Sequence, residues 1–372
     1  MASRSSVDAV ATLRSEPGFS FSAAAGPLPP EVAGDVAEAC RPGAASILSL
    51  PFTSPAFRRL QEETEACLRR LLGIPDRFRV LFLAGGASAQ FAVVPLNLLG
   101  TKGRATYVDS GCWSRRAIAE ARRYAEVSIA ACALGGVPDA AEWQVDRRAA
   151  YCHITSNETA DGLQFHDFPA LAVPLVADMT SDFLTRPLDF TRLSLVYAGT
   201  QKTIGTPGLT VVIVDDRLLH QARAETPRVM DYTQQAAAES RLCTPPVFPI
   251  FVAHRMLHWI EARGGVAAMA RAAQRRSDAV YAALAEGEGT FEIPIERGHR
   301  SLINPCFRLA DEPQTALFLH AAESVGLRDL RGHPEVGGLR VSLYNGIADS
   351  AVDALVGFLL AFARRRGCVS GT

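Results

Sequence analysis

Only two lysines occur in this arginine-rich chain, and one of them lies where an amine could do chemistry. Lysine and arginine together number 38 in 372 residues, yet only Lys102 and Lys202 are lysines. Arginine keeps its charge at physiological pH, whereas a partly buried lysine can lose its proton and attack a carbonyl carbon. Lys102 lies in GTKGR, which is typical of a turn. Lys202, in LVYAGTQKTIGTPG, is therefore the candidate catalytic amine.

A carboxylate lies upstream of Lys202, at the end of an apolar run. Asp178 closes the segment LAVPLVAD, and one further apolar run, LSLVYAG, separates it from Lys202. An acid in this position commonly caps a helix, but it could also pair with the protonated ring nitrogen of an electron-sink cofactor. Because ligands bind beyond the carboxyl ends of parallel strands, we expect both side chains at one edge of a sheet.

Three further segments could supply the remaining parts of a cofactor site. The glycines of LAGGASAQ (Leu83–Gln90) precede a predicted helix, whose N-terminal N–H groups could bind a phosphate. Trp113, in DSGCWSRRA, could stack on a planar ring or pack a loop, and Thr159, in TSNETADG, could donate to a phenolic oxygen. An amine, a carboxylate, a stacking face and a phosphate cradle are together what pyridoxal phosphate requires.

Short apolar runs predict the strands that must position these residues. Near-continuous apolar strands are typical of a mostly parallel sheet covered by helices on both faces, so we expect an α/β fold. The pattern also predicts an amphipathic helix at Pro55–Ile74 and a helix over SAQFAVVPLNLL that Pro95 could kink. The predicted strands are RVLFLAGG, ATYVDSG, VSIAACAL, AAYCHITSNET, LAVPLVADM, LSLVYAG and LTVVIVDD.

The pattern changes after about residue 250. Long helical segments with a break at Gly264–Gly265 are followed by alternating strands and helices, which predicts a smaller C-terminal α/β domain. We therefore predict a flexible leader at residues 1–18, a large domain at 19–255 whose N-terminal segment could join the small domain, and a small domain at 256–372.

Composition excludes several classes of protein. The net charge of −1 gives no electrostatic footprint for nucleic acid or an anionic membrane. The eight cysteines form no CxxC pair and have no zinc-site spacing, so we expect them to be reduced in a cytoplasmic protein without a metal site. No apolar run reaches the length of about 18 residues that a membrane helix needs.

The chain resembles the phosphoserine aminotransferase family in nine segments that occur in the family's order. They are FSAAAGPLPPEV, GGASAQF, GCWS, SNETADG, ADMTSD, YAGTQKTIGTPGLTVVIV, CTPPVFPIF, RSLINPCFRL and GGLRVSLYNG. The resemblance covers roughly Phe19 to Phe362. It implies a fold type I pyridoxal-phosphate transferase: a large domain with a mostly parallel, seven-stranded type of sheet and a smaller C-terminal α/β domain. It also implies a homodimer with shared active sites, which binds an amino acid and a 2-oxo acid.

The resemblance further assigns roles to individual residues. Lys202 is similar to the Schiff-base lysine and proton carrier, Asp178 to the partner of the ring nitrogen, and Trp113 to the stacking residue. Arg340 matches the arginine that binds the substrate α-carboxylate. The other implied cofactor contacts are Ala87, Ser88, Thr159, Thr180, Gln201, Cys243 (asparagine in the family) and Thr244, the last reaching across a dimer interface.

The chain departs from the family where two His-Arg pairs bind the substrate phosphate or the glutamate side chain. The first pair is replaced by Phe52 and Thr53. In the second, His333 is retained, but Pro334 stands at the arginine position and Glu335 follows. Losing two guanidinium groups would cost roughly 3–6 kcal/mol of phosphate binding.

We therefore expect an aminotransferase for a non-phosphorylated amino acid and 2-oxo acid in specialised metabolism, with Phe52, Thr53, His333, Glu335 and Arg340 around the substrate. Three alternatives remain open: pyridoxal-phosphate-dependent elimination, replacement or C–C bond formation on an amino acid; a true phosphoserine aminotransferase with a rearranged phosphate site; and a non-catalytic binding protein. In the second, Arg41, Arg58 or Arg300 could supply the missing charge.

Overall fold

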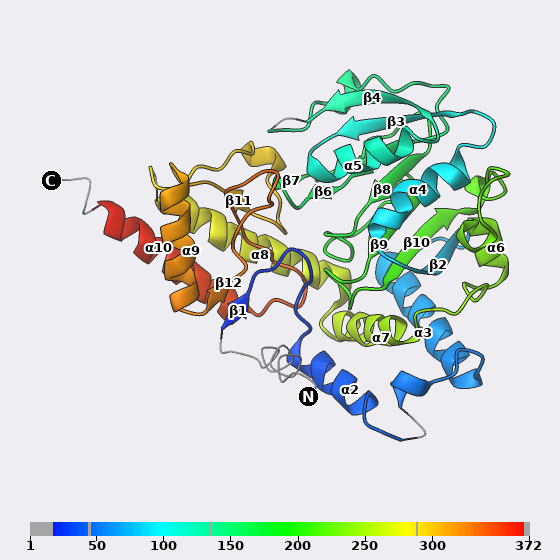
Figure 1. The fold of residues 1–372 in the computed structure, drawn as a ribbon, viewed down its shortest axis with the longest axis horizontal. Coiled ribbons are helices and arrows are strands. Elements are labelled where there is room, and N and C mark those ends of the chain that lie inside the picture. The colour runs from blue at the N-terminus through cyan, green and yellow to red at the C-terminus, as the bar shows by residue number, and fades with distance from the viewer. Residues whose placement is uncertain (1–17, 44–45, 134, 288, 368–372) are drawn as a thin grey trace, which may run out of the picture.

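The computed structural model describes residues 18–43, 46–133, 135–287 and 289–367. Its larger part is built around a seven-stranded sheet, on the right in Figure 1. Except for Gly18, the predicted leader lies outside these ranges. The strand β10 is antiparallel to both of its neighbours, and the other neighbouring strands are parallel. The spatial order is β2 (Phe78–Ala84), β10 (Leu209–Asp215), β9 (Leu195–Gly199), β8 (Leu175–Asp178), β5 (Cys152–Thr155), β3 (Arg104–Asp109) and β4 (Glu126–Cys132).

Both faces of this sheet are buried, as the continuous apolar runs predict. On β10, Val211 and Ile213 belong to one hydrophobic cluster, while Val212 and Val214 belong to the cluster on the opposite face. Successive side chains of a strand point to opposite faces, so a strand buried on both sides is apolar at most of its positions. The fold is therefore α/β, with a mostly parallel sheet between helical layers.

Helices cover each face of the sheet. On one side α3 (Pro55–Leu72) packs against α7 (Val247–Ala262), and on the other side lie α4 (Ala87–Leu98), α5 (Cys112–Ala121) and α6 (Tyr232–Ala237). The bounds of α3 follow from its caps: Ser54 Oγ accepts from Phe57 N at 3.2 Å, and Gly73 ends the helix with φ 63°. The helix α4 continues through Pro95 to Leu98.

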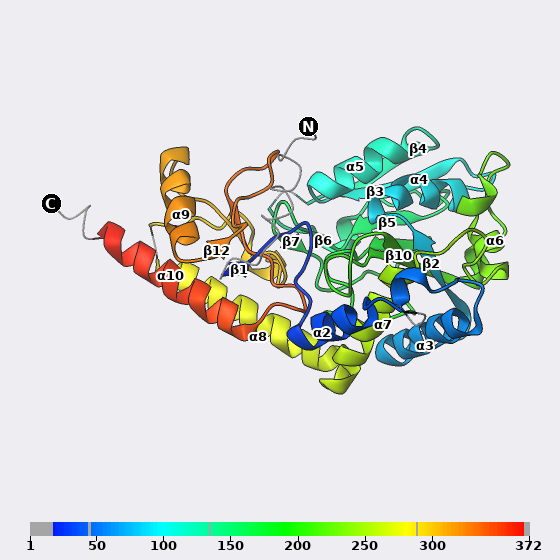
Figure 2. The same ribbon diagram turned by 60° about the horizontal axis from the view of Figure 1, so that its bottom comes forward.

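A second cluster of elements lies beside the sheet (Figures 1 and 2). Its core packs Phe21, Phe318 and Leu355 together, and its N-terminal strand β1 pairs with β12. Among the alternating strands and helices predicted after residue 250, the apolar segment FEIP (residues 291–294) forms no strand and makes only an isolated bridge from Glu292 to Arg308. The elements are β1 (Phe19–Ser20), α8 (Gly265–Glu286), β11 (Cys306–Phe307), α9 (Glu312–Ser324), β12 (Leu327–Arg328), β13 (Leu339–Arg340) and α10 (Asp349–Gly367).

The remaining elements connect these two parts. The helix α2 (Pro30–Ala39) contacts α7, and β6 (Asn157–Glu158) forms a short hairpin with β7 (Leu163–Gln164). The predicted boundary at residues 255–256 falls inside α7, and the division into two domains stays a prediction. No helix in the described ranges has both the length and the apolar character that a membrane crossing requires.

Candidate active site

Lys202 and Asp178 follow neighbouring strands at one edge of the sheet. The strands β8 and β9 are parallel, so Asp178 and the turn that carries Lys202 lie at the same end. Burial lowers the pKa of Lys202 to about 8, although the Asp178 carboxylate opposes this shift. A pKa near 8 leaves a substantial fraction of the amine neutral at physiological pH, as a nucleophile or a proton carrier requires.

Thr180 holds the Asp178 carboxylate in position. Its backbone N–H and its hydroxyl both donate to Asp178 Oδ1, at 3.0 and 2.6 Å. The same hydroxyl oxygen accepts from Gly199 N at 3.2 Å, which connects the acid to the end of β9. Burial raises the pKa of Asp178, while the Thr180 hydrogen bonds and Lys202 lower it. The carboxylate is therefore buried, oriented and next to a cation.

Trp113 and Thr159 form the next part of the site. The indole Nε1 of Trp113 donates to Thr159 Oγ1 at 2.8 Å, and Lys202 Nζ lies 5.4 Å from the Trp113 ring centroid. Because the Thr159 hydroxyl accepts from the indole, its own proton remains available for a ligand oxygen. Residues from three distant segments of the chain thus meet around one aromatic ring.

Glu158 anchors the helix that carries Trp113, a role that the sequence analysis missed. Its carboxylate accepts from the backbone N–H groups of Trp113 and Ser114, both at 2.8 Å, and from Ser110 Oγ at 3.2 Å. Burial, with a contribution from Asp161, raises the pKa of Glu158 to about 7. The sequence signal was one of two acids in the polar loop TSNETADG, and such an acid cannot be distinguished from a solvated residue without the fold.

The predicted phosphate cradle is formed by the start of α4 and the end of β9. Gly86 precedes α4 without any side-chain cap. Ala89 N donates to Gly86 O at 3.0 Å, so Ala87 and Ser88 carry the N–H groups that could bind an anion. A Cβ atom at Gly199 would lie 2.6 Å from Gln201 Oε1 and 3.4 Å from Ala87 N. Ser88 is exposed in the first turn of α4. An uncapped helix start that lies close to Gly199 and the Gln201 side chain fits the phosphate of pyridoxal phosphate.

Arg340 offers an unsatisfied donor to the same site. Its Nη1 donates to Thr159 O at 3.0 Å, whereas its buried Nε has no hydrogen-bond partner in the described chain. A buried guanidinium nitrogen without a partner is unusual and calls for an anionic ligand. This geometry fits a substrate carboxylate next to Lys202, whose pKa Arg340 also lowers.

The rim of the site carries His333, Glu335 and Arg116. The ring centroids of His333 and Trp113 are 6.0 Å apart, and Glu335 forms an ion pair with Arg116 on α5. The Arg116 side chain also stacks on the Trp113 ring, with Cζ 4.8 Å from the centroid. Arg116 is the second functional candidate that the sequence analysis missed, because nothing in WSRRA shows which arginine faces the pocket.

Other predicted residues lie away from this cluster in the single chain. Phe52 packs against the core between the sheet and α3, and Thr53 is exposed. Cys243 and Thr244 are also exposed. Within the described ranges, neither pair hydrogen bonds with Lys202 or Trp113, so their assigned roles stay predictions.

The arginines considered as replacements make other contacts. Arg41 pairs with Glu38 on the surface at 3.0 Å. Arg300 donates from Nε to the carbonyl oxygen of Ile295 at 3.0 Å and lies over the Tyr281 ring. Arg58 is exposed on α3. These contacts give no support to any of the three as the missing phosphate ligand.

Two groups of side chains in the described chain place potential metal ligands within 4.8 Å of one another: Cys67, His258 and Glu261, and Cys112, His333 and Glu335. In the second group Glu335 is already paired with Arg116. In the first, Arg70 hydrogen bonds to both oxygens of Glu261, at 3.0 and 3.3 Å. A guanidinium on each carboxylate opposes the binding of a further cation, so we assign no metal to either group.

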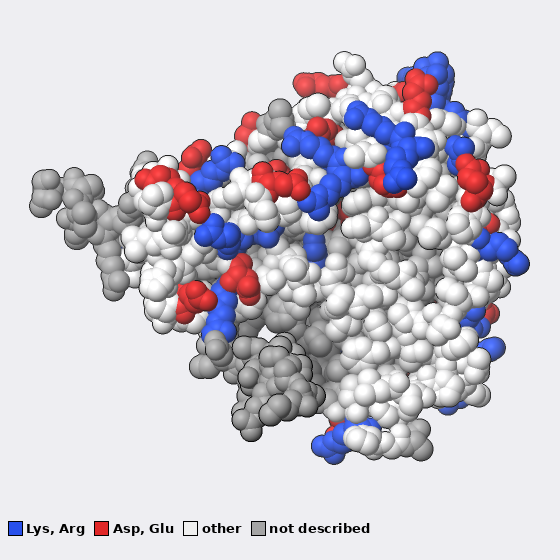
Figure 3. Space-filling model, viewed as in Figure 1, with Lys and Arg blue, Asp and Glu red and all other residues white. Residues whose placement is uncertain are grey.

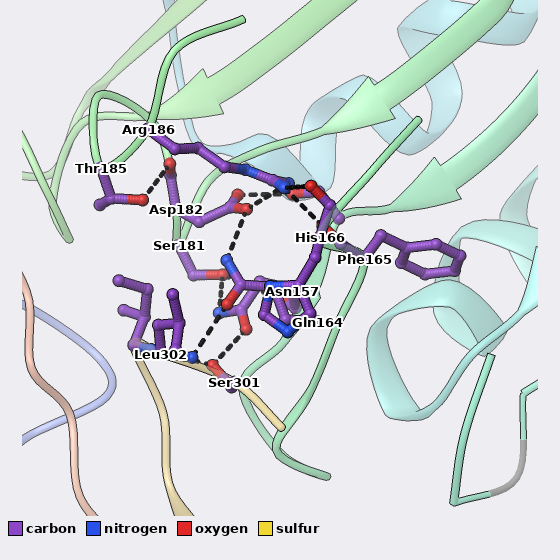
Figure 4. A network of polar contacts seen from close by, with 12 residues as sticks. Asn157, Gln164, Phe165, His166, Ser181, Asp182, Thr185, Arg186, Ser301 and Leu302 are labelled. Carbon is purple, nitrogen blue, oxygen red and sulfur yellow. Dashed lines mark hydrogen bonds and ion pairs between the residues drawn. The ribbon is translucent and has the colours of Figure 1, made fainter. Parts of the chain in front are cut away.

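A buried polar network fixes the C-terminal part against the site (Figure 4). Asn157 Nδ2 donates to Ser181 Oγ at 2.7 Å and to Asn304 Oδ1 at 2.9 Å, and Ser301 Oγ donates to Asn157 Oδ1. Gln164 accepts from Leu302 N at 2.9 Å. Because these groups are buried and hydrogen bonded to one another, they hold the loops after β5 and β8 against the segment before β11, whose Cys306 pairs with Arg340 on β13.

Comparison with known proteins identifies the relatives of this chain. The family model described as aminotransferase class-V matches residues 19–355. The phosphoserine aminotransferase of Acidithiobacillus ferrooxidans is 44% identical over 327 residues, which is 87% of this chain and 90% of the relative. That of Chromobacterium violaceum is 42% identical over 328 residues, or 87% and 91% of the two chains.

Solved structures agree with this relationship. The structure of phosphoserine aminotransferase from Bacillus circulans has a TM-score of 0.91 and 37% identity, covering 95% of this chain and all of that one. The pyridoxal-phosphate-bound enzyme from Trichomonas vaginalis has a TM-score of 0.87 and 32% identity, covering 92% and 99%.

These relatives contradict the expected substrate. At 42–44% identity over most of the chain they carry the name phosphoserine aminotransferase, so the prediction of a non-phosphorylated substrate in specialised metabolism was wrong. The charge count considered the two motif positions and Arg41, Arg58 and Arg300 as replacements, but it did not include Arg116. The fold brings Arg116, which belongs to neither motif, to the rim beside Glu335.

Proposed function

This chain belongs to the aminotransferase class-V family, and from this relationship we propose that it is a phosphoserine aminotransferase with a rearranged phosphate site. The reaction would transfer the amino group of phosphoserine to a 2-oxo acid and release 3-phosphohydroxypyruvate. The observation that carries the proposal is that the buried Lys202 lies over the Trp113 ring with the Asp178 carboxylate acting on it, in a chain whose relatives carry the name phosphoserine aminotransferase.

Pyridoxal phosphate is the cofactor of this family, and when bound it supplies an electron sink for the bond broken at the substrate α-carbon. Lys202 would move the proton to and from that carbon, since its lowered pKa lets it exchange a proton near neutral pH. Asp178 would hold positive charge at the ring nitrogen, and Trp113 would cover the ring face.

Arg340 would orient the substrate through its α-carboxylate. Its buried Nε lacks a partner, and its Nη1 is held by Thr159 O at 3.0 Å, so the guanidinium is placed before substrate arrives. A planar carboxylate can accept two parallel hydrogen bonds from such a group. With the carboxylate bound at Arg340, the phosphate of the substrate must reach a different part of the pocket.

We propose that the active enzyme is a cytoplasmic homodimer. Cys243 and Thr244 are exposed in the single chain, which suits a contact donated to the partner subunit. The apolar side chains of Val229 and Met230 are 48% and 40% exposed. The surface over β9 and β10, as seen in the shared view of Figures 1 and 3, carries few charged side chains, which suits a protein interface. Sedimentation at the 39.9 kDa mass of one chain would contradict the dimer.

The proposal is tested by product analysis of the purified protein loaded with pyridoxal phosphate. Phosphoserine and 2-oxoglutarate are supplied, and we expect 3-phosphohydroxypyruvate and glutamate in equal amounts, with no product from the Lys202→Ala variant. Pyruvate, ammonia and free phosphate would instead indicate elimination. Turnover of serine with the same efficiency as phosphoserine would contradict a phosphate-specific enzyme.

A further inference from the structure

Arg116 places a second cation on the indole ring of Trp113. Its Cζ lies 4.8 Å from the ring centroid, and Lys202 Nζ lies 5.4 Å from the same centroid. Arg116 follows Trp113 by three positions on α5, so the two side chains share one face of the helix. The ring therefore connects the catalytic lysine to an arginine that matches no motif of the family.

A cavity of about 230 Å³ opens beside Arg116. Glu335, from the loop before β13, also lines it and forms an ion pair with Arg116. The Arg116 side chain is 43% exposed and the Glu335 side chain 62% exposed, so this ion pair is hydrated and contributes little to the stability of the fold. The cavity residues are Cys112, Arg115, Arg116, Ala119, Glu335 and Val336.

The loop that carries Glu335 holds its shape by its own backbone. Gly332 N donates to Gly338 O at 2.9 Å, and Gly337 N donates to His333 O at 2.7 Å. A Cβ atom at Gly332 would lie 2.0 Å from Gly337 O, so only glycine allows this closure. The backbone of Glu335 is thus held at the cavity, while its side chain is 62% exposed.

The same loop orients His333 as a second donor. Glu335 N donates to His333 Nδ1 at 3.2 Å. In a neutral imidazole whose Nδ1 accepts, the proton resides on Nε2, which is then a donor. One fixed imidazole donor and one guanidinium next to the Trp113 ring form a pair suited to a phosphate ester.

We propose that Arg116, with His333, binds the phosphate of phosphoserine, and that Glu335 is the resident counter-ion displaced by this phosphate. This inference rests on the proposed function and supplies the cation that Pro334 removes from the family motif. A phosphate monoester forms stronger charge-assisted hydrogen bonds with a guanidinium than an exposed glutamate does, because it carries more charge and more acceptor oxygens.

The test compares three variants of the holoenzyme. Arg116→Gln removes the cation, Glu335→Gln removes its competitor, and Arg115→Gln is the matched control. Arg115 is the neighbouring residue on α5 and lines the same cavity, but it pairs with Asp109 at 2.9 Å. Dissociation constants for phosphoserine and for serine are measured by calorimetry, together with KM for phosphoserine.

We expect Arg116→Gln to raise the dissociation constant and the KM for phosphoserine by roughly 10- to 100-fold, and to leave the dissociation constant for serine unchanged. Glu335→Gln should lower the phosphoserine constants by about two- to fivefold. A misfolded variant cannot bind more tightly, so this gain distinguishes a binding role from general damage. Arg115→Gln should stay within about twofold of the parent enzyme, because its partner Asp109 lies outside the cavity.

Unchanged phosphoserine binding in Arg116→Gln would overturn the inference and leave the proposed function standing. An equal loss of phosphoserine affinity in Arg115→Gln would overturn the inference as well, because any positive charge near the cavity would then explain phosphate binding. If the parent enzyme binds phosphoserine through Arg116 but does not transaminate it, the subsite is supported and the proposed function fails. No binding by the parent enzyme would overturn both.

Discussion

The buried end of the active site and its exposed rim differ in how their residues are fixed. At the buried end, Asp178 is held by two hydrogen bonds from Thr180, and Trp113 by Glu158 and Thr159. At the rim, Glu335 and Arg116 are 62% and 43% exposed and hold each other. Buried polar groups tolerate few replacements because each lost partner is costly, whereas an exposed pair can be exchanged. Residues at the buried end are therefore fixed by several hydrogen bonds each, whereas the residues at the rim are held by one hydrated ion pair.

The largest effect should come from replacing the amine at the buried end. Lys202→Arg keeps a positive charge but cannot act as a nucleophile or proton carrier, so we expect kcat to fall by more than about 10⁴-fold. Single-turnover kinetics with phosphoserine would measure this. A loss of only tenfold would mean that Lys202 merely supplies charge.

A smaller loss should follow a change in the buried acid. Asp178→Asn keeps one oxygen for Thr180 but removes the negative charge, so we expect kcat to fall by roughly 10²- to 10³-fold. The thermal midpoint should change little, which separates the electrostatic effect from unfolding. An Asp178→Asn enzyme with parental kcat would contradict the role of this carboxylate.

The two regions should also differ in how much a glutamate in each contributes to the stability of the fold. Glu158→Ala leaves the N–H groups of Trp113 and Ser114 and the Ser110 hydroxyl without their buried acceptor, which should destabilise the protein by roughly 2–5 kcal/mol. Glu335→Ala, at the rim, should leave the denaturation midpoint unchanged within error. Urea unfolding of the two variants measures both values, and equal losses would remove the distinction between buried and exposed ends.

The smallest effect concerns pH. The neutral amine of Lys202 is its reactive form, so the rate at which apoprotein takes up pyridoxal phosphate should rise about tenfold per pH unit below pH 8 and level off above it. Growth of the visible absorbance band after mixing follows this rate. A rise that continues toward pH 10 would show a lysine with an ordinary pKa.

The sequence predicted the buried end far better than the rim. Lys202, Asp178, Trp113 and Thr159 follow apolar strands whose order and burial are set by short-range patterns, so their convergence could be expected. The family, the cofactor and the α/β fold were predicted and are confirmed by the comparisons.

The substrate end could not be predicted because it depends on distant segments that meet only in the folded chain. Arg116 lies on α5 and Glu335 lies more than two hundred positions later, and neither residue type signals the contact. The role of Glu158 was not predicted for the same reason, since the N–H groups that it accepts from lie on α5. Counting charges at motif positions therefore gave the wrong substrate.

The central claim is that an intact cofactor pocket still serves a phosphorylated substrate despite the lost arginines. Its most direct test is a titration of the holoenzyme with phosphoserine and with serine, in the absence of any 2-oxo acid. The visible absorbance band is the quantity recorded during the titration. The account predicts that phosphoserine abolishes the visible band at concentrations at least about tenfold lower than serine does. Equal concentrations for the two amino acids, or no response to phosphoserine, would contradict it.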